Sequence, residues 1–304
     1  MDTTQVTAPQ EVTLCAICQS CVDPLRHVRC HKDGFAILQC PECGLVFRGT
    51  SPDDEELARI YADEYFFSEK GETEGQGYLD YIKDEEFFRT NAKRRLTEIN
   101  KRQSSPGSLL DVGCAAGFFM DEARNTGWNV RGVEYSPTMA AWARDQLGLD
   151  VAVGKFQEFD TTPESFSLVT MWDYLEHSID PVGDLKKAYE LLQPGGLLVL
   201  STGDIRSLAA RFSGRRWHLL TPRHHLYYFS PPPLVRCLQD QNFTVLSRSY
   251  PSDKYSVRYV SHKLYTMLPF SWLKKLAKAI DRSRVGGFLI PINLFDIMTI
   301  HARK

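Results

Sequence analysis

Cysteines near the amino terminus are arranged for metal binding. They form two C-x-x-C pairs about twenty residues apart: Cys15, Cys18, Cys40 and Cys43. Each pair places two thiolates on one turn, and two pairs complete a tetrahedral zinc site. Four protein ligands leave no open coordination position, so we expect a structural Zn²⁺ that helps a small module to fold. Cys21 and Cys30 lie nearby, and two alternatives stay open: one of them replaces a ligand, or no metal binds.

The stretch from Leu109 to Met120 has the residue types of a ligand-binding turn. An apolar run that contains Asp111 is followed by Gly113 and Gly117 and then by an amphipathic segment. This order predicts a strand, a tight turn and a helix. Glycines let the backbone approach a ligand closely, and the N-terminus of the helix points N–H groups at the same place. Asp111 at the end of the strand can accept hydrogen bonds from a polar or cationic ligand.

The letters D-V-G-C-A-A-G-F-F in this stretch resemble motif I of the class I S-adenosylmethionine (SAM) methyltransferases. Segments 128–134, 165–173 and 191–202 match later parts of that family's pattern in order and spacing. The resemblance implies SAM as the cofactor and an acid, Glu134, that accepts the ribose hydroxyls. The alternative is a dinucleotide-binding dehydrogenase with the motif G-x-G-x-x-G, although Ala115 replaces its middle glycine.

The same resemblance implies a set of residues that contact the cofactor. They lie in the turn and after the first four predicted strands: Asp111, Gly113, Cys114, Ala115, Gly117, Phe118, Glu134, Tyr135, Phe156, Gln157, Asp173 and Tyr174. Tyr135 and Phe156 are expected to lie against the adenine ring. Gln157 stands where such families often place an acidic or amide side chain for the adenine amino group.

The residues from Asp173 to His177 follow the fourth predicted strand and read D-Y-L-E-H. This pattern resembles the E-x-x-E-H site that binds a divalent cation in ubiquinone-type O-methyltransferases. The resemblance implies a cation held by Asp173, Glu176 and His177, which would orient the oxygens of an acceptor. In the alternative, Asp173 and Tyr174 only line the pocket, and Glu176 and His177 are structural. Asp173 and His177 are therefore candidate catalytic residues.

The stretch from His225 to Ser230 reads H-x-x-Y-F-S. It resembles part of the Y-H-E-H-x-x-Y-F-S motif of sugar C-methyltransferases that also carry an N-terminal zinc module. In that family the last histidine acts near the substrate as a base, so His225 is our candidate general base. The other motif positions hold Pro222, Arg223 and His224 here. The alternative is a histidine that only packs a loop.

These side chains require a scaffold in which strands alternate with helices. The predicted elements indicate an α/β fold, and the resemblance implies a Rossmann-like, seven-stranded, doubly wound sheet with an antiparallel last strand. We divide the chain into a zinc ribbon (1–50), a helical cap or lid (51–103) and a SAM methyltransferase domain (104–304) with a helical insertion at about 252–288. The cap either only packs on the domain or closes over the cofactor with Tyr65 or Tyr78.

Composition limits the function further. The chain has 304 residues, of which 43% are hydrophobic, and a formal net charge of −2. It thus lacks the basic excess of a nucleic-acid-binding protein, and we expect no nucleic acid partner. It has neither a membrane-spanning apolar run nor a signal-peptide layout, so we expect a cytoplasmic location. We predict a SAM-dependent methyltransferase for a small-molecule acceptor: a sugar, a glycan precursor, a quinone-like ring or a secondary metabolite. The alternatives are an RNA methyltransferase that binds RNA through the ribbon, and a non-catalytic SAM-binding scaffold.

Overall fold

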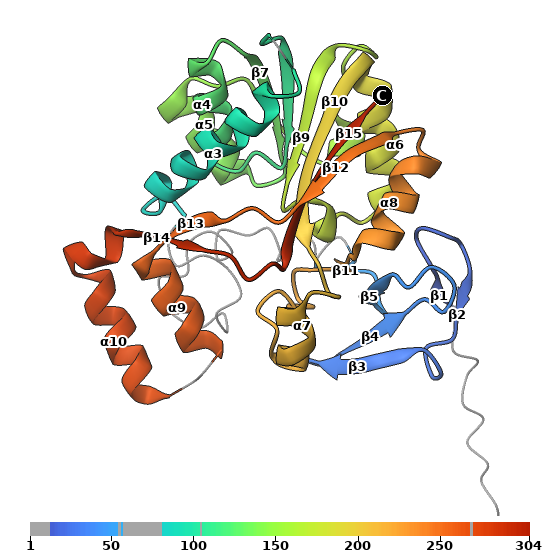
Figure 1. Cartoon of the computed structure of the whole chain (residues 1–304), viewed down its shortest axis with the longest axis vertical. Coiled ribbons are helices and arrows are strands. Elements are labelled where there is room, and N and C mark those ends of the chain that lie inside the picture. Colours follow the sequence, from blue (N-terminus) through green and yellow to red (C-terminus); the bar gives the residue numbers. More distant parts are fainter. Residues whose placement is uncertain (1–12, 54–55, 57–80, 104, 268–269) are drawn as a thin grey trace, which may run out of the picture.

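The computed structural model describes residues 13–53, 56, 81–103, 105–267 and 270–304. Its central layer is a seven-stranded sheet in the order β12-β15-β10-β9-β6-β7-β8 (Figure 1). The strands are β6 (Ser108–Val112), β7 (Asn129–Glu134), β8 (Val151–Val153), β9 (Phe166–Trp172), β10 (Leu192–Gly203), β12 (Thr244–Ser249) and β15 (Ile297–Arg303). β15 runs antiparallel to both of its neighbours, whereas the other pairs in this sheet are parallel. The prediction of a seven-stranded, doubly wound sheet is therefore confirmed.

Helices cover both faces of this sheet (Figure 1). The helices on one face are α3 (Glu85–Asn100), α4 (Phe118–Asn125) and α5 (Pro137–Leu147), and those on the other are α6 (Pro181–Leu191) and α8 (Pro231–Asp240). Local sequence signals set where they begin. The Ser136 hydroxyl accepts from the backbone N–H of Met139, and the Asp180 carboxylate accepts from that of Gly183, each just before a proline that starts the helix. The central strands β6 and β9 and the second half of β10 are mostly apolar because both of their faces are buried between these two layers.

The cysteine-rich segment forms a small antiparallel sheet that continues into a distant part of the chain. Its strands are β3 (Val28–Lys32), β4 (Phe35–Gln39), β5 (Val46–Arg48) and β11 (Tyr227–Tyr228), and β1 (Thr13–Leu14) pairs separately with β2 (Cys21–Val22). β11 pairs with β5 through Tyr227 and Phe47. Phe47 and Leu45 also share a buried cluster with Phe229 and Leu234. The predicted boundary near residue 50 therefore separates strands that belong to one sheet and side chains that belong to one buried cluster.

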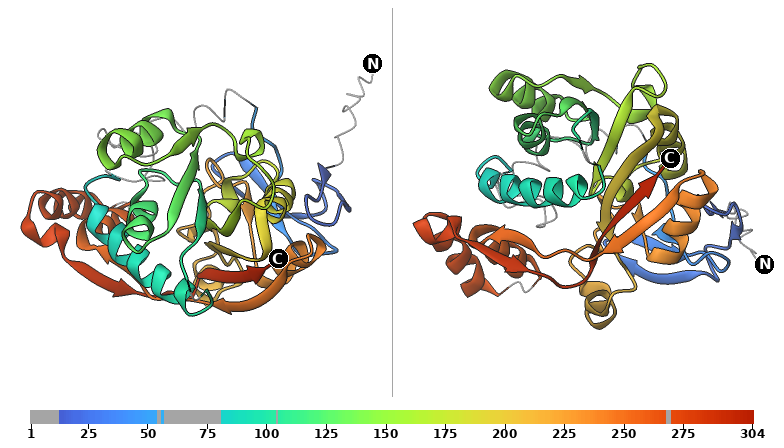
Figure 2. Two further views of the ribbon diagram at one scale, coloured as in Figure 1. Left: turned by 90° about the horizontal axis from the view of Figure 1, so that it is seen from above. Right: turned by 45° about the horizontal axis from the view of Figure 1, so that its top comes forward.

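The predicted helical insertion is a two-helix hairpin carried on a β-ribbon. β13 (Asp253–Ser256) pairs with β14 (Leu289–Ile292), and α9 (Val257–Met267), α10 (Ser271–Asp281) and the 3-10 helix η4 (Arg284–Gly287) lie between them. In Figure 1 this hairpin and the β3–β5 sheet lie at the same end of the central sheet, the end at which its parallel strands finish, and Figure 2 shows the arrangement from two more directions. Both elements thus flank the edge at which α/β folds bind ligands.

The remaining short elements lie close to that edge. They are the helix α7 (Leu208–Ser213) and the 3-10 helices η1 (Phe156–Glu158), η2 (Leu175–His177) and η3 (Gly214–Arg216). Among the described residues, no helix combines the length and the apolar character needed to cross a bilayer. Tyr65 and Tyr78 lie outside the described residues, so the lid stays a prediction.

Candidate active site

The glycine turn between β6 and α4 has the backbone that its sequence predicts. Gly113 and Gly117 have φ angles of +71° and +78°, a region that favours glycine. A Cβ on Gly113 would lie 2.8 Å from the Tyr174 ring. A Cβ on Gly117 would lie 2.5 Å from Cδ1 of Leu149 and 3.2 Å from Cβ of Ala143. Gly113 therefore leaves room for the Tyr174 ring beside the turn, whereas Gly117 lets α4 pack closely against α5.

Glu134 holds this turn from the end of β7. The backbone N–H of Ala115 donates to its Oε2 at 2.7 Å, and that of Ser136 donates to its Oε1 at 2.8 Å. Burial raises the pKa of Glu134, although these N–H donors oppose the shift. Each carboxylate oxygen has a second lone pair, so the side chain can brace the turn and also accept from a ligand hydroxyl.

Charged side chains converge beside the turn. The Thr170 hydroxyl donates to Asp111 at 2.6 Å, and burial raises the pKa of Asp111 to about 7 despite this bond. Arg95 reaches in from α3, with its guanidinium 4.3 Å from the centre of the Trp172 ring. Its Nη2 lies 3.3 Å from a carboxylate oxygen of Asp253 and 4.0 Å from one of Asp173. The buried carboxyl of Asp111 and the guanidinium of Arg95, which lies beside two carboxylates, thus belong to one site.

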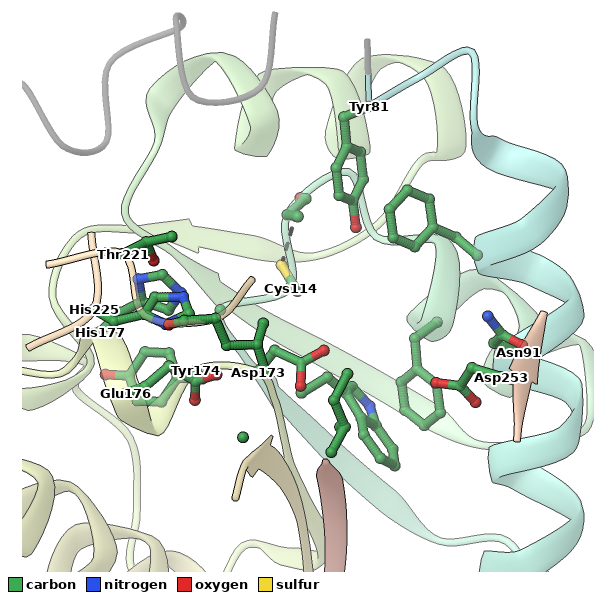
Figure 3. A pocket seen from close by; sticks show the side chains of 18 of the residues that line it. Tyr81, Asn91, Cys114, Asp173, Tyr174, Glu176, His177, Thr221, His225 and Asp253 are labelled. Atoms are coloured by element: carbon green, nitrogen blue, oxygen red, sulfur yellow. Dashed lines mark hydrogen bonds between the residues drawn. The ribbon is translucent and has the colours of Figure 1, made fainter. Parts of the chain in front are cut away.

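A single cavity of about 670 Å³ connects these groups. Eleven of the twelve predicted cofactor residues line it: Asp111, Gly113, Cys114, Ala115, Phe118, Glu134, Tyr135, Phe156, Gln157, Asp173 and Tyr174. Gly117 is not among the lining residues, because its Cα faces α5. The candidate catalytic residues Asp173, His177 and His225 line the same cavity. Figure 3 shows the two histidines on one side of it and Asn91 and Asp253 on the other.

Gln157 lines the cavity, but its amide already has a protein partner. Its Nε2 donates to Oδ1 of Asp184 at 2.6 Å, and the Tyr174 hydroxyl donates to Oδ2 of the same carboxylate at 2.9 Å. Asp184 is buried, and burial raises its pKa against these donors. This bond uses the amide nitrogen of Gln157, whereas the predicted contact with the adenine amino group would use the amide oxygen, Oε1, as acceptor.

His177 and His225 form a T-shaped pair with ring centroids 4.6 Å apart. Nδ1 of His177 lies 3.0 Å from the carbonyl oxygen of His224, and Nδ1 of His225 lies 2.8 Å from that of Leu219. A carbonyl can only accept, so each Nδ1 carries the hydrogen and Nε2 is the acceptor of the neutral ring. Burial lowers the pKa of His177 to about 4 and that of His225 well below its usual value. Both rings are therefore neutral near pH 7.

These two histidines and Glu176 have the geometry of a cation site. One ligand atom from each of Glu176, His177 and His225 lies within 4.8 Å of the others. Glu176 Oε2 is buried and has no hydrogen-bond partner among the described residues. Asp173 lies outside this cluster, and its carboxylate accepts from the Ser201 hydroxyl at 2.8 Å. The donor set fits a divalent cation, but with His225 where the sequence resemblance implied Asp173.

The four ribbon cysteines lie together as predicted. Cys15 Sγ is 3.5 Å from Cys43 Sγ, Cys18 Sγ is 3.5 Å from Cys40 Sγ, and all four sulfurs lie within 4.8 Å of one another. Thiolates 2.3 Å from a tetrahedral zinc would be about 3.8 Å apart, so the cluster fits this ion. The candidate alternatives Cys21 and Cys30 are not part of it.

Several lining residues carry no motif that the sequence could reveal. They come from α3, from the loop after β10, from the insertion and from the residue before β15: Asn91, Arg95, Trp217, His218, Asp253, Tyr255, Lys263 and Asp296. Arg95 is one of several basic residues in a helical segment, and His218 lies in an irregular, arginine-rich loop. Their roles depend on the tertiary fold, which brings separate segments to one end of the sheet.

Comparison with known proteins identifies the family. A protein-family model described as a methyltransferase domain matches residues 84–248. This match covers more than half of the chain and includes the glycine turn, Glu134, Asp173 and His225. The chain therefore belongs to the methyltransferase domain family, within the class I SAM-dependent methyltransferases.

Individual relatives are more distant. The chain is 32% identical over 115 residues to a ubiquinone biosynthesis O-methyltransferase of Xanthomonas campestris pv. campestris (strain B100), a match that covers 36% of this chain and 48% of the relative. It is 33% identical over 115 residues to a protein of the same name from Pseudomonas aeruginosa (strain UCBPP-PA14), covering 36% and 50% of the two chains. The chain thus spans about half the length of the curated relatives that it matches. A solved SAM dependent methyltransferase from Archaeoglobus fulgidus is 17% identical, with a TM-score of 0.49 and coverage of 71% and 94%.

Proposed function

We propose that this protein transfers a methyl group from SAM to a small-molecule acceptor: a sugar, a glycan precursor, a quinone-like ring or a secondary metabolite. The observation that carries the proposal is the single cavity, which joins the glycine turn and Glu134 to the His177–His225 pair. This cavity lies at the carboxyl ends of the parallel strands, where open α/β sheets bind their ligands. A donor and an acceptor therefore have room in one cavity.

The cofactor would lie along the β6–β7 half of the cavity. Glu134 has lone pairs available for the ribose hydroxyls, and the turn at Gly113 leaves space for the methionine part of SAM. The methionine part of SAM carries a carboxylate and an ammonium group. Arg95 suits the carboxylate because a guanidinium binds carboxylates through paired N–H donors. Asp111 suits the ammonium, which would keep this buried carboxyl ionised.

The acceptor would occupy the part of the cavity beyond β9 and β10. The methyl group of a sulfonium is activated by the positive charge on sulfur, so the protein mainly has to align the donor and the acceptor. Asp173, Tyr174 and the two histidines line the cavity after these strands. Glu176, His177 and His225 would hold a divalent cation, which when bound supplies positive charge that orients acceptor oxygens.

The ribbon zinc has a structural role in this proposal, held by its four cysteines. The names of the curated relatives support a quinone-like ring among the candidate acceptors. An RNA methyltransferase and a non-catalytic SAM-binding scaffold remain the alternatives. The expected cytoplasmic location and the expected lack of a nucleic acid partner stay predictions.

Calorimetry and a transfer assay test the proposal. We expect SAM to bind with a low-micromolar dissociation constant, about −8 kcal/mol. Glu134→Ala should raise that constant at least about tenfold, because hydrogen bonds to a charged acceptor contribute about 1.5–3 kcal/mol each. Asp145→Ala, at an exposed acid on α5, is the control. Equal SAM affinity in wild type and Glu134→Ala would contradict the cofactor assignment. Tight SAM binding without methyl transfer to any acceptor in a broad panel would instead favour the scaffold.

A further inference from the structure

Besides His177 and His225, the cavity is lined by His218, which lies in the loop after β10 and has a carboxylate partner. Nε2 of His218 lies 2.8 Å from Oδ2 of Asp296. A carboxylate can only accept, so Nε2 carries the hydrogen and Nδ1 is the acceptor of the neutral ring. His218 and Asp296 both line the cavity, and the His218 side chain is 19% exposed. The pair thus has the arrangement of a histidine base that a carboxylate orients.

The surrounding structure fixes the position of Asp296. The indole N–H of Trp217 donates to the same Oδ2 at 2.8 Å, and the backbone N–H of Asp204 donates to the Asp296 carbonyl at 2.7 Å. The Asp296 side chain is only 4% exposed. Burial would raise the pKa of Asp296, but the His218 and Trp217 donors outweigh it, and its pKa lies below the usual value. A fixed, ionised carboxylate therefore stands behind the imidazole.

His225, the base that the sequence predicts, lacks this support. Its Nδ1 faces the carbonyl of Leu219. The Glu176 carboxylate lies within 4.8 Å in the candidate cation site, but its buried Oε2 makes no hydrogen bond to the ring among the described residues. Its ring packs against His177, within the cluster that fits a cation. Proton uptake is thus better supported at His218 than at His225.

We propose that His218, oriented by Asp296, is the general base for an acceptor with an acidic O–H or C–H group. The inference rests on the proposed methyl transfer from SAM. Nδ1 of His218 takes the proton of the acceptor, and the electron pair left on the acceptor atom forms the new bond to the methyl carbon. The bond from that carbon to sulfur breaks, and its electrons stay on sulfur as a neutral thioether. Asp296 stabilises the imidazolium until the proton leaves to water. The acceptor class is therefore a hydroxyl, phenol or enolisable carbon acid rather than an amine.

The test compares variants with SAM and a panel of catechol, 3,4-dihydroxybenzoate, a thymidine diphosphate deoxyhexose and phenethylamine. His218→Gln keeps an N–H that can reach Asp296 but has no basic nitrogen, so kcat should fall roughly 100-fold while SAM affinity and melting temperature stay near wild type. Asp296→Asn should lower kcat at least about tenfold through loss of the imidazolium partner. In His218→Ala, free imidazole should restore part of the rate, which a purely structural role would not allow. His31→Asn, at an exposed ribbon histidine, is the control.

The outcomes separate this base from the wider proposal. A His218→Gln enzyme with near-native kcat, or transfer to phenethylamine alone, would overturn the base and leave the methyltransferase proposal standing. Binding of SAM without transfer to any of the four compounds would overturn both. The tautomer is tested without an acceptor, by nitrogen-15 spectra of labelled histidine. We expect His218 as the Nε2–H form at pH 8, and the Nδ1–H form would contradict the geometry.

Discussion

The two glycines at the ends of helices in the cofactor half allow a direct test of why Gly117 is needed. Gly117 precedes α4 and Gly148 follows α5, and both have positive φ angles, +78° and +62°. Their surroundings differ, because a Cβ on Gly117 would meet Leu149 and Ala143, whereas a Cβ on Gly148 has nothing within 4 Å. Gly117→Ala and Gly148→Ala therefore share the backbone strain and differ in the steric cost.

The magnitudes follow from these two terms. An alanine with this backbone costs about 1–2 kcal/mol of the free energy of unfolding at either position. Forcing an extra carbon between Gly117, Leu149 and Ala143 costs about a further 1–3 kcal/mol. We expect Gly148→Ala to lower the melting temperature by about 2–8 °C and Gly117→Ala by about 4–20 °C, at about 2–4 °C per kcal/mol.

Differential scanning fluorimetry measures these changes, and calorimetry with SAM at low temperature shows whether binding follows. Because Gly117 does not line the cavity, its variant should lose affinity only several-fold, as a shifted α4 disturbs the turn. Equal melting temperatures for the two alanine variants would refute the steric argument. Complete loss of SAM binding in a folded Gly117→Ala protein would instead show that this glycine contacts the cofactor, as the sequence motif implied.

Two predictions concern metals. Cys40→Ser/Cys43→Ser should lose the bound zinc in elemental analysis and should melt at a lower temperature, because the ribbon shares a sheet and a core with the rest of the fold; full zinc occupancy would refute this ligand set. Glu176→Gln should weaken Mn²⁺ binding at least about tenfold in calorimetric titrations, since a charged ligand is lost. The exposed acid variant Glu164→Gln should not change it, and identical titrations for wild type and Glu176→Gln would count against the cation site.

The sequence predicted the fold well, and most of the residues that it assigns to the cofactor line one cavity, since both depend on local patterns. Strand, glycine turn and helix follow one another within a few residues around Gly113, and the acid at Glu134 ends the next strand. The acceptor half was harder to predict. Trp217 and His218 meet Asp296 only because the loop after β10 folds back beside the start of β15. Nothing in local periodicity signals that contact.

The identity of the base shows the same limit. A partial motif match pointed to His225, and the structure does place that residue in the cavity. A motif match cannot show which partner each ring nitrogen has, and that partner decides what a histidine can do. Nδ1 of His225 faces a backbone carbonyl, whereas Nε2 of His218 faces a carboxylate. We therefore infer different roles for these two histidines of one loop.

Hydrogen bonds between backbone groups connect the ribbon to the candidate active site. β5 pairs with β11, and the N–H of Arg48 donates to the carbonyl of Leu226 at 2.8 Å. The N–H of Leu226 donates in turn to the carbonyl of Glu176, also at 2.8 Å. His225 directly precedes Leu226, so the ribbon sheet helps to hold both Glu176 and His225. A zinc that touches neither cofactor nor acceptor would thus influence the acceptor half of the cavity, because it stabilises the ribbon sheet, and β5 of that sheet helps to position Glu176 and His225.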